Sequence, residues 1–200
     1  MAKNTHLEHL EDDIFNSGYN GATNSINFLI GLRDMLTTGK GGGNTKVTVK
    51  WDGAPAIVCG TDPQTGEFFV GNKSVFNKTT PKICYTDDFV DEHYPASGLN
   101  PILKMCLAEL SKLPIRGVIQ GDLLYEKRPS IVSMKGKKCY VFKPNTITYC
   151  VEVDSDLGRQ ISQSKIGIVF HTRYNGADIS SMAASFGVDV KPLQGVGSVA

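Results

Sequence analysis

One stretch of alternating side chains constrains this chain more than any other. Residues 46–59 read Lys-Val-Thr-Val-Lys-Trp-Asp-Gly-Ala-Pro-Ala-Ile-Val-Cys. Because side chains two apart on a strand share a face, the alternation predicts a β-strand with Lys50 and Asp52 facing one space and Trp51 facing a core. Gly53 and the Ala-Pro-Ala after it halt this pattern. An amine beside a carboxylate suits covalent nucleotidyl transfer, and the alternative is a solvated lysine on a half-buried strand.

The segments around this strand predict three parts. Residues 1–38 carry apolar side chains at helical spacing in two runs separated by Gly18-Tyr-Asn-Gly21, which predicts two helices as a preface. Residues 39–45 are glycine-rich and predict a linker. Residues 46–200 are expected to form one further domain.

Within that domain, the pattern predicts an α+β fold with mainly antiparallel sheets. The turn signal at 61–66 joins the first strand to a second arm over 67–76, which predicts a hairpin. Residues 79–98 are expected to be irregular, and 99–113 to form an amphipathic helix. Further strands are expected at 117–125, 138–142, 146–153 and 165–171.

The composition indicates the cellular compartment of the protein but does not identify its binding partner. The formal net charge of +1 gives no global attraction for a polyanion, so such a site would need local clustering of lysine and arginine. The five cysteines are widely spaced and form no Cys-x-x-Cys motif, which indicates a reducing compartment. No apolar run resembles a signal peptide or a membrane span. We therefore expect a cytoplasmic protein that does not enter membranes.

Several basic side chains are candidates for binding phosphate. His171 and Arg173 close the last strong strand, where they could bind a phosphate group or pair with an acid at the sheet edge. Arg128 and Lys143 lie in predicted loops, where they could follow a nucleic-acid backbone or keep the surface solvated.

Lys50-Trp-Asp-Gly53 resembles motif I of the covalent nucleotidyltransferase superfamily, which comprises ATP-dependent DNA ligases, RNA ligases and messenger-RNA capping enzymes. The resemblance implies that Lys50 attacks the α-phosphate of ATP or GTP, releases pyrophosphate and retains the nucleotide as a phosphoramidate. It also implies a ligase-type adenylation domain, in which antiparallel sheets form a nucleotide cleft, and a requirement for Mg²⁺.

The resemblance assigns further residues to nucleotide binding. Asp52 and Gly53 would shape the pocket, and Lys73 in Gly71-Asn-Lys-Ser-Val75 stands where the family has a basic Ser-Arg motif. Asp122 stands at the acid of motif III, which contacts ribose or metal. Phe142, in preference to Tyr149, would stack on the base.

Three departures from the family pattern are visible. Ile166 stands where motif IV has a glutamate, so that carboxylate is either supplied by Glu152 or Asp154, replaced by a different metal site, or missing from a chain that does not catalyse. Lys191 stands alone where the closing motif has paired lysines. The ligases' C-terminal oligonucleotide-binding domain has no counterpart, which suggests a C-terminally incomplete chain.

Over about residues 5–176 the sequence also resembles proteins of large tailed bacteriophages, which implies the cytoplasm of a host cell. The expected function is an ATP-dependent, polynucleotide ligase-like nucleotidyltransferase that forms lysyl-AMP and acts on DNA or RNA. Three alternatives stay open: a capping-type guanylyltransferase, a non-catalytic nucleic-acid or nucleotide-binding module of the same fold, and a virion or host-interaction protein in which Lys50 is structural.

Overall fold

Five antiparallel strands form the larger of two sheets in the computed structural model, which describes residues 9–38, 51–194 and 198–200. The predicted α+β class with antiparallel sheets is confirmed. The two sheets lie in the second of two compact units, Met1–Val49 and Lys50–Ala200. The strands of the larger sheet follow the spatial order β2 (Phe68–Gly71), β1 (Ala56–Thr61), β3 (Val118–Tyr125), β7 (Gly167–Asn175), β8 (Ala183–Phe186).

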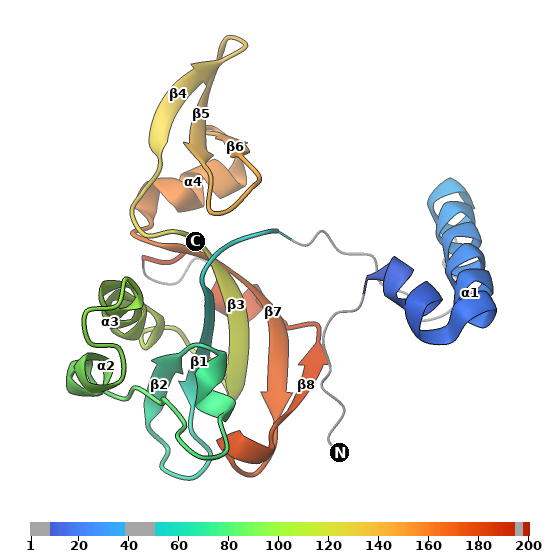
Figure 1. Cartoon of the computed structure of the whole chain (residues 1–200). Helices are drawn as coiled ribbons and strands as arrows, with labels where there is room; N and C mark the ends of the chain where they lie inside the picture. Colours follow the sequence, from blue (N-terminus) through green and yellow to red (C-terminus); the bar gives the residue numbers. More distant parts are fainter. Residues whose placement is uncertain (1–8, 39–50, 195–197) are drawn as a thin grey trace. The chain divides into compact units, whose positions relative to one another are not determined.

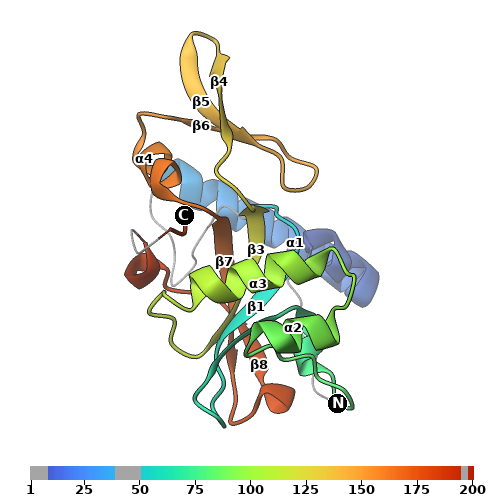
Figure 2. The same ribbon diagram turned by 90° about the vertical axis from the view of Figure 1, so that its left-hand side faces the viewer.

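Two helices cover one face of this sheet, α2 (Asp87–His93) and α3 (Leu99–Leu110) (Figures 1 and 2). Leu103 and other side chains of α3 pack with Ile119 and Leu123 of β3 in the main core. The prediction of a helix from residue 99 is confirmed. The prediction that 79–98 is irregular is wrong, because α2 is one short helix whose single fully buried residue, Val90, gives no periodicity to detect.

The other face of the sheet is covered by two short 3₁₀ helices, η1 (Lys73–Phe76) and η2 (Ile179–Ser181). The predicted hairpin is confirmed, with Val58 opposite Gly71, but its second arm ends at Gly71 and not at residue 76. The Asn72 side chain accepts a hydrogen bond from the Ser74 N–H at 2.8 Å, which caps η1 and turns the chain out of the sheet.

The first predicted strand is shorter than expected. β1 begins at Ala56, residues 51–55 belong to no strand, and residues 46–50 lie outside the described part. Backbone bonds from Ala54 N–H to the Leu123 carbonyl and from Leu123 N–H to the Pro55 carbonyl, both 3.0 Å, still tie this segment to β3. Pro55 has no N–H to offer a neighbouring strand, which favours an irregular approach to the sheet.

A smaller sheet has the order β4 (Ser130–Met134), β5 (Lys137–Phe142), β6 (Tyr149–Glu152). Ile161 of α4 (Asp156–Gln163) joins Tyr140, Phe142 and Val151 in a separate core beneath it. The sequence predicts neither β4 nor α4. Every residue of β4 is exposed, and α4 is mostly polar, so neither shows the burial pattern on which such a prediction depends.

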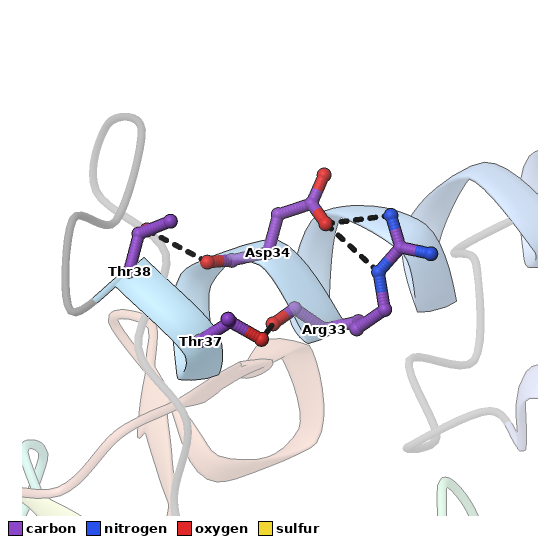
Figure 3. A network of polar contacts seen from close by, with 4 residues as sticks. All are labelled: Arg33, Asp34, Thr37 and Thr38. Atoms are coloured by element: carbon purple, nitrogen blue, oxygen red, sulfur yellow. Dashed lines mark hydrogen bonds and ion pairs between the residues drawn. The ribbon is translucent and has the colours of Figure 1, made fainter.

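The N-terminal unit contains α1 (Leu10–Thr38), which is interrupted at Gly18. Gly18 has φ 56°, so the chain turns there and the two predicted helices follow one another. Ser25 Oγ donates to the Leu10 carbonyl at 3.0 Å across the turn. At the C-terminal end, Arg33 and Asp34 form an ion pair, and the Thr37 and Thr38 hydroxyls donate to carbonyls one turn back (Figure 3). No helix in the described ranges is both long and apolar enough to cross a membrane.

A buried carboxylate joins α3 to the C-terminal residues. Glu109 is 6% exposed and accepts hydrogen bonds from Lys112 at 2.8 Å, from Lys165 at 3.0 Å and from Ser198. The Lys112 and Ser198 bonds, with Lys165, lower the pKa of Glu109 from 4.5 to about 2. Residues 198–200 in turn lie parallel to the start of β7, with Ile168 N–H donating to the Ala200 carbonyl at 2.8 Å.

The lowered pKa of Glu109 predicts how the free energy of unfolding decreases in acid. Because the folded pKa lies below the ordinary one, Glu109 contributes its full stabilisation above pH 4.5 and loses it as the pH falls toward 2. We expect Glu109→Gln to lower the free energy of unfolding at pH 7 by about 1–2 kcal/mol, and the deficit to vanish near pH 2. Denaturant titrations across this range measure it. The exposed Glu92→Gln should keep wild-type acid dependence, and an unchanged pH profile for Glu109→Gln would contradict the assignment.

Candidate active site

The predicted nucleophile, Lys50, lies outside the described residues, so the site is defined by the residues that follow it. Trp51 stacks on Tyr149 with ring centroids 4.7 Å apart and an interplanar angle of 20°, and lies 6.4 Å from Phe142. Tyr125 meets Phe142 edge-on at 5.2 Å. This aromatic cluster, Trp51, Tyr125, Phe142 and Tyr149, fixes the position of Trp51 at the start of the described segment.

Asp52 is held by the loop that precedes β6. Its carboxylate accepts from Asn145 Nδ2 at 3.0 Å and from Thr146 Oγ1 at 3.4 Å. Its backbone N–H donates to the Tyr149 hydroxyl at 2.6 Å, and that hydroxyl donates to the Asp52 carbonyl at 3.3 Å. Since these partners are neutral, the loop orients the carboxylate and leaves its negative charge available to a ligand.

Gly53 brings this segment directly onto β3. A Cβ atom at Gly53 would lie 2.6 Å from the Leu123 carbonyl oxygen and 2.9 Å from Asp122 Cβ, so only glycine fits without movement. Ala56, three residues later, is the direct partner of Asp122 in the β1–β3 ladder. Gly53 and the β3 residue Asp122 therefore lie next to one another, although they are far apart in the sequence.

A β-bulge places His171 beside Asp122. Gln120 of β3 pairs with Thr172 and Gly121 pairs with Phe170, which leaves His171 as the extra residue of β7. Its Nε2 lies 3.4 Å from Asp122 Oδ1, and its Nδ1 lies 2.7 Å from Thr172 Oγ1. Asp122 is only 8% exposed. Two residues that sequence analysis singles out for separate reasons thus form one polar pair.

A second polar contact joins the same two strands, β3 and β7. The Tyr174 hydroxyl donates to Gln120 Oε1 at 2.7 Å, on the same face of the sheet. Burial raises the pKa of Tyr174, which keeps the hydroxyl protonated and donating. Sequence analysis gives neither Gln120 nor the Asn145 and Thr146 loop a role, since no motif marks them.

The basic residue predicted to contact phosphate or ribose lies at the same end of β1. Lys73 is exposed on η1 and lines a shallow pocket of about 460 Å³ together with Pro55, Ala56 and Asn72. Phe142 is 8% exposed within the aromatic cluster, and it borders a larger groove that also contains Ala54.

Two other predicted residues lie elsewhere. Arg173 is the ladder partner of Ile119, whose side chain is buried on the α3 side of the sheet, and it lines a separate cavity of about 360 Å³. Lys191 begins a further 3₁₀ helix, η3 (Lys191–Leu193), and is exposed. Neither hydrogen-bonds to Asp122 or His171 within the described ranges.

The position of the missing glutamate is part of the core. Ile166 is fully buried. Of the two alternatives, Glu152 forms an ion pair with Lys137 at 2.6 Å on the smaller sheet, and Asp154 lies in the turn after β6. Among the residues that the structure describes, no group of three His, Cys, Asp or Glu side chains could hold a metal ion. The site thus offers two separate carboxylates, Asp52 and the buried Asp122, as oxygen donors.

Comparison with known proteins gives one result. The model of a family of unknown function, DUF6267, matches residues 4–199. No curated protein and no solved structure matches the chain. The site must therefore be interpreted from its own geometry.

Proposed function

As this chain belongs to the family of unknown function DUF6267, we propose its activity from the motif resemblance and the geometry of the site: ATP-dependent nucleotidyl transfer through a lysyl-AMP intermediate at Lys50. One observation carries the proposal. The segment that follows Lys50 lies against β3 at Asp122, with Gly53 in a contact that excludes any side chain. This juxtaposition is what a nucleotide bound between motif I and motif III requires.

In the proposed reaction, the neutral Lys50 amine attacks the α-phosphorus of ATP. A nitrogen–phosphorus bond forms, the bond to the pyrophosphate oxygen breaks, and the amine loses a proton. In the second step, an oxygen of the 5′ phosphate of a nucleic-acid end attacks the same phosphorus, a phosphorus–oxygen bond forms, and the nitrogen–phosphorus bond breaks as the Lys50 amine leaves and regains a proton. Asp52 would shape the pocket in the orientation that Asn145 and Thr146 give it, and Lys73 would contact phosphate or ribose.

The site offers one buried carboxylate, Asp122, as a ligand for Mg²⁺. Mg²⁺ prefers oxygen ligands and is commonly held by one or two carboxylates together with substrate phosphates, so Asp122 alone is a sufficient protein ligand. When bound, the ion supplies positive charge to the triphosphate. His171, at 3.4 Å from Asp122, would hold that carboxylate in place.

A second function is favoured by the buried Ile166: a nucleotide-binding or nucleic-acid-binding module of the same fold that does not turn over. A capping-type reaction with GTP would use the same lysine. These alternatives differ from the main proposal in whether a covalent product forms and from which nucleotide.

The test is covalent labelling of the wild-type protein with Mg²⁺ and ATP or GTP labelled at the α-phosphate. We expect a labelled band on denaturing electrophoresis, an intact-mass increase of one AMP, and loss of the label in acid, as for a phosphoramidate. ATP labelled at the γ-phosphate should give no label, which separates nucleotidyl transfer from phosphorylation. Preference for GTP would point to the capping variant, and absence of an adduct with either nucleotide would overturn the proposal.

A further inference from the structure

A local excess of positive charge lies in one segment of this nearly neutral chain. Residues 126–143 contain six lysine or arginine side chains and a single carboxylate, Glu126, whereas the whole chain carries a formal charge of +1. The segment comprises the β4–β5 hairpin and its two flanks, and in Figures 1 and 2 the hairpin projects away from the larger sheet. The six residues are Lys127, Arg128, Lys135, Lys137, Lys138 and Lys143.

Most of this charge is uncompensated. Of the six side chains, Lys137 alone forms an ion pair in the described part of the chain, with Glu152. By contrast, Lys104 on α3 pairs with Asp91, and Lys112, just after this helix, pairs with Glu109. All six residues of the segment are exposed, so their charges are free to meet an anionic partner.

A groove of about 670 Å³ runs along the base of the hairpin and gathers three of these charges. Lys127, Arg128 and Lys143 line it, with Ile102 and Met105 of α3 among its apolar residues. Its lining also includes Ala54, the residue after Gly53. The groove therefore connects the basic segment to the candidate active site.

We infer that the groove and the β4–β5 hairpin bind the sugar–phosphate backbone of a single nucleic-acid strand. Lys137 and Lys138 lie at one end of β5 and Lys143 follows its other end, so the cations span the length of this strand, about 20 Å for six residues, which is longer than a single phosphate group requires. An anionic bilayer is flat, so it would contact the projecting hairpin and leave the recessed groove cations unused. The inference deepens the proposed function, on which it rests for the role of this strand as the acceptor of AMP.

Binding is tested apart from catalysis, in Lys50→Ala protein without nucleotide. The probe is a fluorescent single-stranded oligonucleotide of about 20 nucleotides, prepared as DNA and as RNA. Its fluorescence anisotropy measures the binding constant over a range of salt concentrations. The test variant is Arg128→Gln with Lys143→Gln. Its matched control, Lys78→Gln with Arg116→Gln, also removes one lysine and one arginine that are exposed and form no ion pair among the described residues.

We expect the groove variant to bind about tenfold more weakly at low salt and its slope of log K against log salt to fall by about 1.4, the value for two lost phosphate contacts on a single strand. The control should match the parent protein, and all variants should share its thermal midpoint. Equal losses in both variants, no binding by the parent, or binding to phosphatidylserine vesicles without binding to the oligonucleotide would overturn the inference. Because this assay contains no nucleotide and the labelling assay no nucleic acid, each proposal fails separately.

Discussion

Replacing Lys50 by alanine or by arginine should reduce covalent nucleotide labelling to background. The nitrogen–phosphorus bond can form only at a neutral amine. Alanine removes that amine, and arginine keeps the positive charge on a guanidinium that does not deprotonate in proteins. A lysine that only attracted the triphosphate by its charge would tolerate arginine, so the arginine variant separates nucleophile from electrostatic contact. Phosphor imaging of denaturing gels and intact mass measure the result.

The control for this loss is Lys104→Ala. Lys104 pairs with Asp91 on the α3 side of the sheet, and its removal should leave labelling at the wild-type level. The emission of Trp51, the single tryptophan of the chain and the neighbour of Lys50, shows in each variant whether the aromatic cluster is intact. Labelling that survives Lys50→Ala would place the adduct on another residue and remove the main proposal.

The sequence predicts best where burial follows a regular period. The β1–β2 hairpin and α3 each bury one side of a repeating pattern, and both occur as predicted in kind, although the arms of the hairpin are shorter than predicted. The elements that the sequence misses or misassigns, β4, α2 and α4, lack such a pattern because they are exposed, short or polar. The start of β1 is misplaced because alternation continues through Trp51 while its ring is committed to Tyr149 and not to the sheet.

The candidate site could be predicted only in part, for a different reason. A motif identifies single residues such as Asp122, but it does not report which strands become neighbours. The pairing of His171 with Asp122 depends on one bulged residue in β7, which alternation does not reveal. The bonds from Asn145 and Thr146 to Asp52 come from a loop without periodicity. Likewise, the sequence shows the cations of residues 126–143. It does not show that, in the described part of the chain, all of them except Lys137 lack an ion pair.

Gly53→Ala should produce the largest loss of stability among the variants considered. The added Cβ would lie 2.6 Å from the Leu123 carbonyl oxygen, which is a backbone atom of the central strand and cannot rotate away. Residues 51–55 must therefore shift from β3, which breaks the Ala54 to Leu123 hydrogen bond and strains the stack of Trp51 on Tyr149. We expect the free energy of unfolding to fall by about 2–3 kcal/mol, and the thermal midpoint by about 5–10 °C.

The matched control is Gly98→Ala. A Cβ there meets nothing within 4 Å and its φ is −59°, so the midpoint should stay within about 2 °C of wild type. Calorimetry gives the midpoints, and a changed Trp51 emission in Gly53→Ala alone would locate the shift at the site. Labelling measured well below the variant's midpoint then separates the two effects: a folded Gly53→Ala protein should still lose the adduct, because the displaced segment carries Lys50 and Asp52. Wild-type stability in this variant would mean that Gly53 does not lie against β3, and the observation that carries the proposed function would be lost.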